Sequence, residues 1–136
     1  PFCQKHTIDF DLKQQFEKYF SGEFERKTNR IKELNDAYLN YIKCISQVLQ
    51  DALNYMKNSI IACDTAEFEI KINNYIATLK ENLSVFETKS KEPSRVFDCS
   101  TTNLLANEIN KYIESYNKKI EEEFDEFCVC CVDDLD

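Results

Sequence analysis

The sequence predicts an all-α protein: an up-down bundle of three long helices plus a short N-terminal helix, stapled by disulfides. Apolar residues recur at steps of three and four over most of the 136 residues, and no run alternates in polarity for long enough to form a strand. The chain also holds only one glycine and two prolines. A chain of this length fits one domain, so we expect residues 1–136 to form a single helical domain with an acidic, cysteine-rich tail from about residue 128.

Two of the expected helices precede Cys63. A short helix over about 8–20 is followed by a natural break at Ser21 and Gly22. A second helix over about 23–61 would be about 60 Å long, so we expect a bend over 54–59. The apolar stripe of the short helix comprises Ile8, Leu12, Phe16, Tyr19 and Phe20, and that of the long helix Ile31, Leu34, Tyr38, Tyr41, Ile45, Val48, Ala52, Met56 and Ile60.

Two further helices follow Cys63. Asp64 is a good N-cap, and Glu67 three residues later completes a capping-box-like arrangement. The third helix runs to about Thr88, residues 89–100 form a loop around Pro93, and the fourth helix covers about 102–127. Their inward stripes are Phe68, Ile72, Tyr75, Ile76, Leu79, Leu83 and Phe86, and then Leu105, Ile109, Tyr112, Ile113, Tyr116, Ile120, Phe124 and Phe127.

The cysteine content predicts an extracellular protein. Seven cysteines without a metal motif are typical of secreted proteins, which use them as staples. The chain begins at Pro1 without an initiator Met, as after removal of a signal peptide or after trimming. Asn82, Leu83 and Ser84 form the one N-glycosylation sequon, inside an expected helix.

Sequence alone leaves the disulfide pairing open. The expected topology places Cys63 and the end of the fourth helix at one pole of the bundle, within reach of each other. The disulfide candidates are Cys3, Cys44, Cys63, Cys99, Cys128, Cys130 and Cys131. Cys63 can bridge to any of the last three, and Cys3 to Cys44 or Cys99. An odd number leaves one thiol over, either as a free thiol or as an intermolecular bridge that links a homodimer.

The residues that catalysis needs are missing. His6 is the one histidine, in a polar segment, and the sequence contains no G-x-S-x-G, phosphate loop or H-E-x-x-H motif. The C-x-C-C run at Cys128 lacks the second ligand pair that zinc sites show. Dense carboxylates on helices are typical of solvated faces. We therefore expect no enzyme activity, no catalytic residues, no metal and no cofactor.

The net charge of the chain and its tyrosines restrict the classes of partner that it could bind. A net charge of −8 argues against nucleic acid and anionic membrane surfaces, and no apolar stretch approaches the ~20 residues that span a bilayer. Five tyrosines lie on or beside the stripes: either their hydroxyls reach the surface from a filled core, or they orient an apolar ligand in a wide interior. They are Tyr38, Tyr41, Tyr75, Tyr112 and Tyr116.

Several segments resemble those of a known class of secreted proteins. Tyr41-Ile42-Lys43-Cys44, Cys63, Phe97-Asp98-Cys99 and Phe127-Cys128 are similar in spacing to small, helical, cysteine-containing insect proteins of the tsetse EP-domain type. The resemblance covers about residues 40–131, and Cys130 and Cys131 depart from it. It implies a secreted protein of gut, saliva or haemolymph with no enzymatic role.

The leading hypothesis is a secreted helical bundle that binds another protein, such as a host factor. Its acidic face over residues 121–126 would steer it towards a basic partner. A carrier of a small hydrophobic ligand or lipid is the alternative, and a disulfide-linked structural component is the second. A filled core with an exposed apolar patch would favour protein binding, and an internal cavity lined by Phe and Tyr would favour the carrier.

Overall fold

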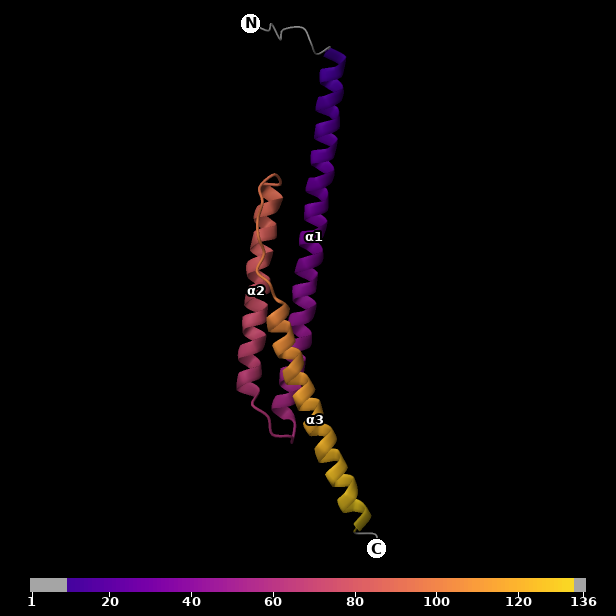
Figure 1. The fold of residues 1–136 in the computed structure, drawn as a ribbon, viewed down its shortest axis with the longest axis vertical. Helices are drawn as coiled ribbons and strands as arrows, with labels where there is room; N and C mark the ends of the chain where they lie inside the picture. The colour runs from indigo at the N-terminus through magenta and orange to yellow at the C-terminus, as the bar shows by residue number, and fades with distance from the viewer. Residues whose placement is uncertain (1–9, 134–136) are drawn as a thin grey trace.

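The computed structural model describes residues 10–133, with side chains up to residue 128. Three helices make up the fold: α1 (Phe10–Asn58), α2 (Thr65–Lys91) and α3 (Asn103–Asp133), and the described residues contain no strand. Figure 1 shows α2 running antiparallel to both α1 and α3. The all-α helical bundle predicted from the sequence is confirmed.

The short N-terminal helix and its break were predicted wrongly. From Phe10, α1 runs as one helix of 49 residues, about 74 Å long, through Ser21 and Gly22. Gly22 does not have a positive φ, and a Cβ there would meet nothing within 4 Å. A glycine costs a helix only about 1 kcal/mol relative to alanine, and good helix formers on both sides carry the helix across it. The predicted helix end at about 61 is three residues late, because α1 ends at Asn58 and the chain bends over residues 59–61.

Local chemistry sets both ends of α2. The Asp64 side chain caps its start by accepting hydrogen bonds from the amides of Ala66 and Glu67, each 3.1 Å long. This confirms the predicted cap, although the Glu67 carboxylate pairs with Lys71 at 3.3 Å. At the other end the Glu92 amide donates to the Thr88 carbonyl, and Pro93 follows.

α3 is staggered relative to the other two helices. The 92–102 connection runs back along α2, so that α3 begins part-way down α2 and ends well beyond the turn between α1 and α2 (Figure 1). The backbone stays helical to Asp133, so the predicted helix end at about 127 is six residues early.

The core lies where α2 contacts α1 on one side and α3 on the other. Its buried members come from all three helices: Ile42, Leu49, Leu53, Met56, Phe68, Ile72, Tyr75, Leu79, Ile109 and Tyr116. The α2 stripe was predicted correctly, but the buried face of α1 is rotated. Leu34, Tyr41 and Val48 are exposed because α2, and not α3, is the helix that packs closely on α1. Within residues 10–133, no helix has the length and apolar character that a membrane span requires.

Candidate functional site

The first candidate surface is the N-terminal part of α1, residues 10–24, here named the α1 end. Figure 1 shows this segment projecting beyond α2 and the loop after it, with no other helix alongside. It is nonetheless rich in apolar side chains, and the sequence placed several of them in an inward stripe. The exposed large apolar residues here are Phe10, Leu12, Phe16, Tyr19, Phe20 and Phe24.

The aromatic rings of the α1 end contact one another. Phe20 stacks with Phe16 at 6.2 Å between ring centroids and meets Tyr19 edge-on at 5.8 Å. Phe20 and Phe24 are nevertheless 62% and 53% exposed, since neither of the other two described helices covers them. Ring pairs of this kind hold the side chains in place without removing them from water.

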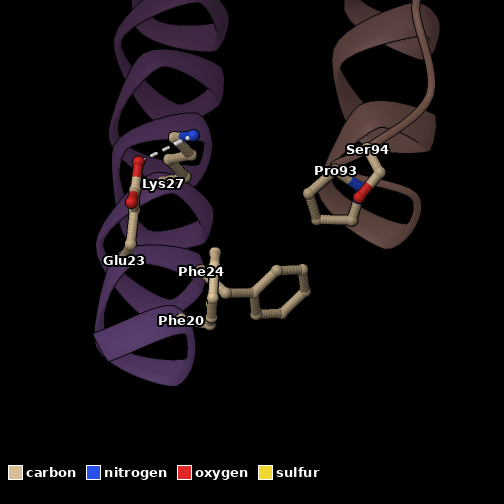
Figure 2. A pocket seen from close by; sticks show the side chains of 6 residues that line it. All are labelled: Phe20, Glu23, Phe24, Lys27, Pro93 and Ser94. Atoms are coloured by element: carbon tan, nitrogen blue, oxygen red, sulfur yellow. Dashed lines mark ion pairs between the residues drawn. The ribbon is translucent and has the colours of Figure 1, made fainter. Parts of the chain in front are cut away.

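A hollow of about 770 Å³ opens where the α1 end leaves the bundle. Phe20 and Phe24 form one side of it and Pro93 and Ser94 the other, as Figure 2 shows. Glu23 and Lys27 also line it and pair with each other at 2.9 Å. The hydrogen bond and the charge of Lys27 lower the pKa of Glu23, so this edge of the hollow carries a fixed ion pair. The volume lies within the range of binding sites, but the hollow is a surface cleft.

The second candidate surface lies at the opposite pole of the molecule. Here α3 extends past the turn after α1, and Ile60, Ile61, Ile120, Phe124 and Phe127 line a hollow of about 450 Å³ together with Glu123. Phe124 and Phe127 are 65% and 66% exposed. We name this surface, residues 120–128 of α3 with the two isoleucines of the turn, the α3 end. Phe124 and Phe127 were predicted to point inward, but neither α1 nor α2 covers them among residues 10–133.

Buried side chains pack together between the three helices of residues 10–133. Phe68 has 0% exposure and stacks on Tyr112 at 4.7 Å. Tyr112 donates its hydroxyl to the Asp64 carbonyl, and Tyr75 exchanges a 2.8 Å hydrogen bond with Tyr41. Burial is the main reason that the pKa values of Tyr75 and Tyr112 rise to about 12. Three of the tyrosines singled out in the sequence, Tyr41, Tyr75 and Tyr112, therefore form hydrogen bonds that link different parts of the bundle.

Asn82 has a structural role that its sequon conceals. It is 5% exposed, its amide donates to the Ser100 carbonyl at 2.9 Å, and its oxygen accepts from the Ser100 amide at 2.7 Å. These two bonds hold the returning loop against α2, and a buried amide offers no acceptor to a glycosylating enzyme in the folded protein. The spacing of Tyr75, Leu79 and Asn82 was the available signal, because it places Asn82 on the buried face.

The cysteines are not gathered into bridges within the described residues. Cys44, Cys63, Cys99 and Cys128 are free, and only Cys63 is partly buried. Of the three partners that the sequence left open for Cys63, Cys128 is not bonded to it in the structure. Cys63 lines a small hollow with Tyr112 and Tyr116, and Cys128 lies twelve residues, or about 18 Å of helix, beyond Tyr116. Pairings with Cys3, Cys130 or Cys131 involve side chains outside the described residues and stay predictions.

In the part of the chain that the structure describes, side chains suited to metal binding or catalysis are not brought together. No cluster of three or more His, Cys, Asp or Glu side chains there could hold a metal ion. His6 lies outside the described residues. What the geometry offers is two apolar helix ends, one at each pole.

A family model described as AAA domain matches residues 1–126. The chain belongs to the AAA domain family. A phosphate loop of the G-x-x-x-x-G-K-[ST] type needs two glycines, and this AAA domain family member has one, Gly22, inside α1. The family match therefore comes without that nucleotide-binding motif in these 136 residues. No curated protein and no solved structure matches this AAA domain family member.

Proposed function

We propose that this chain is a non-enzymatic helical protein that acts by binding another protein, and that the α1 end is its main contact surface. The observation that carries the proposal is the exposed aromatic face of a helix that projects beyond its own bundle. Exposed apolar patches of this kind mark interaction sites on soluble proteins. Phe and Tyr are also enriched at the centres of protein interfaces.

The filled core supports protein binding over carriage of a ligand in the interior. Leu53, Phe68, Ile72 and Leu79 are all fully buried and occupy the space between the helices. A second candidate function is carriage of a small hydrophobic ligand. It is supported by a groove of about 360 Å³ between α1 and α3, lined by Tyr41, Val48, Ile109 and other side chains. Native mass spectrometry tests it: a lipid-sized mass that is lost on denaturation would favour the carrier.

Binding through the α1 end is tested by paired variants. We expect Phe20→Ser with Phe24→Ser to lose the proteins that the wild-type chain captures from an extract of its own source. Ile70→Ser is the matched control, because Ile70 is 61% exposed on α2, away from both ends. Since all three side chains are more than half exposed, the variants should fold. Equal capture by the double variant and the wild type would refute the proposal.

Secretion is part of the same proposal and rests on the seven cysteines. Intact mass under denaturing, non-reducing conditions is the measurement. A chain from a secretory source that is six hydrogens lighter than the reduced chain would contain three disulfides, which would have to involve Cys3, Cys130 and Cys131. A fully reduced chain from that source would count against extracellular stapling and against a disulfide-linked structural role.

ATP turnover is the activity that membership of the AAA domain family first suggests. Its measurement therefore tests the proposed absence of enzyme activity. We expect no phosphate release above buffer, because the chain has no glycine-rich loop to hold the phosphates. Turnover that co-purifies with the chain and is abolished by removing the chain would overturn this part of the proposal.

A further inference from the structure

We propose that the hollow around Cys63 is a covalent binding site, in which Cys63 holds a small carboxylate-bearing thiol, such as cysteine, as a mixed disulfide. The hollow lies where the start of α2 meets the middle of α3. The inference does not rest on the proposed function, because no residue of the α1 end lines this hollow.

The position of Cys63 in the fold separates it from the cysteines of α1 and of the loop after α2. Cys44 lies fourteen residues before the end of α1, or about 21 Å of helix from the turn that carries Cys63. Cys99 precedes Ser100, whose backbone is bonded to Asn82, seventeen residues or about 26 Å from the start of α2. A disulfide needs Cα atoms within about 7 Å of each other, so neither cysteine reaches Cys63.

The cysteines at the end of α3 are equally remote from the hollow. The backbone places Cys130 and Cys131 about 21 Å of helix beyond Tyr116, which lines the hollow with Cys63. Of the seven cysteines, Cys63 is therefore the one that these positions favour as the odd thiol without a partner in its own chain.

A second, independent observation points to a ligand at the same place. Tyr116 is only 3% exposed, and its hydroxyl forms no hydrogen bond within the described residues. A buried hydroxyl without a partner is costly, so it calls for a ligand atom that accepts from it. Ser115 and Lys119 also line the hollow, and each adds a donor that no hydrogen bond or ion pair within residues 10–128 engages. A carboxylate is the group that matches several such donors.

The acids of the hollow limit what else the ligand carries. The Asp64 carboxylate is engaged by the amides at the start of α2, and one oxygen of Glu67 pairs with Lys71 at 3.3 Å. The second oxygen of Glu67 can still accept from an ammonium group, so the hollow matches both charges of an amino acid. Its volume of about 260 Å³ lies below the range of about 300–1,000 Å³ for drug-sized ligands, which suits an occupant as small as cysteine.

The covalent step is thiol–disulfide exchange with a small disulfide such as cystine. Cys63 loses its thiol proton to water, and the thiolate attacks one sulfur of cystine. The bond from Cys63 Sγ to that sulfur forms as the S–S bond of cystine breaks, and the other half leaves as a thiolate that takes up a proton. One disulfide replaces another, so no further oxidant is consumed. Burial, and then the neighbouring Cys63, raise the pKa of Tyr112 to about 12, so Tyr112 stays neutral beside the thiolate.

The test is the equilibrium occupancy of each cysteine of the full chain in a buffer of cystine and cysteine, read by acid quenching and peptide mass mapping. We expect the ratio of mixed disulfide to free thiol at Cys63 to exceed that at exposed Cys44 on the order of tenfold, because only Cys63 offers donors to the captured half. Lys119→Gln should lower the ratio at Cys63 about threefold with cystine, but not with cystamine, which has no carboxylate. Lys111→Gln is the matched control, because Lys111 is exposed on the same helix and does not line the hollow. Tyr116→Phe keeps the ring in the core and should also lower the ratio with cystine.

The outcomes that overturn the inference are distinct from those that overturn the proposed function. Equal ratios at Cys63 and Cys44 would overturn the site, as would a disulfide map of the chain from its source in which Cys63 pairs with another cysteine. Equal loading by cystamine and cystine would overturn recognition of the carboxylate, and a preference for oxidised glutathione would overturn the small size of the occupant. None of these results bears on capture through Phe20 and Phe24, so the two proposals fail separately.

Discussion

Replacing Asn82 by alanine tests whether one buried amide holds the loop between α2 and α3 in place. The change removes both hydrogen bonds to Ser100. Each contributes about 0.5–1.5 kcal/mol net, or about 2 kcal/mol together. Alanine returns about 0.6 kcal/mol through its better helix propensity. We expect the free energy of unfolding to fall by about 1–2 kcal/mol.

The assay is urea unfolding followed by helical circular dichroism. At a slope of about 1.5 kcal/mol per molar, this loss moves the unfolding midpoint down by about 1 M urea. Asn74→Ala is the control, because Asn74 is exposed on the same helix and its side chain makes no hydrogen bond within the described residues. That variant should unfold at the wild-type urea concentration or slightly above it.

A third variant separates the hydrogen bonds from packing. Asn82→Leu keeps the branching of the side chain, leaves no cavity and removes both bonds, so it should lose at least nearly as much stability as Asn82→Ala. If Asn82→Ala and Asn74→Ala unfold at the same urea concentration, the bonds to Ser100 contribute nothing and the reasoning is refuted. If only the alanine variant is destabilised, the effect is a cavity and not a hydrogen bond.

Three further predictions test the core, the long helix and the tyrosines. Phe68→Ala should cost about 3–5 kcal/mol of unfolding free energy in urea, whereas exposed Phe16→Ala should cost almost nothing. Gly22→Ala should raise the thermal unfolding midpoint, because alanine adds about 0.5–1 kcal/mol to a helix interior with open space around it. Burial raises the pKa of Tyr75 and of Tyr112 to about 12, above the unfolded value near 10, so their contribution to stability is present below pH ~10 and lost as the pH rises to ~12. Urea midpoints at about pH 9 and about pH 11 measure that loss, and equal midpoints would contradict it.

Helix α2 was the element most fully predictable from the sequence. Asp64 supplies a side-chain cap, Pro93 closes the other end, and the apolar residues from Phe68 to Leu79 follow one face. These signals are local, so no knowledge of neighbouring helices is needed to read them. The buried position of Asn82 follows from the same spacing.

The wrong predictions concern structural features that depend on more than the local sequence. Gly22 weakens a helix by about 1 kcal/mol, but whether the chain breaks there depends on the cooperative gain of the whole helix. In α1, Tyr38, Ile45 and Leu49 alternate with Leu34, Tyr41 and Val48, so the sequence offers two apolar faces. Only the position of α2 decides which of them is buried.

The unequal lengths of the helices explain both candidate surfaces. With 49 residues, α1 is far longer than the 27-residue α2 beside it, and α3 is displaced towards the other pole. A helix that merely extended into water would need no apolar face beyond the last residue its neighbour covers. Here the apolar pattern continues past that point at both poles, to Leu12 in one direction and Phe127 in the other. Two exposed apolar faces, one at each pole, are therefore left for a partner to cover.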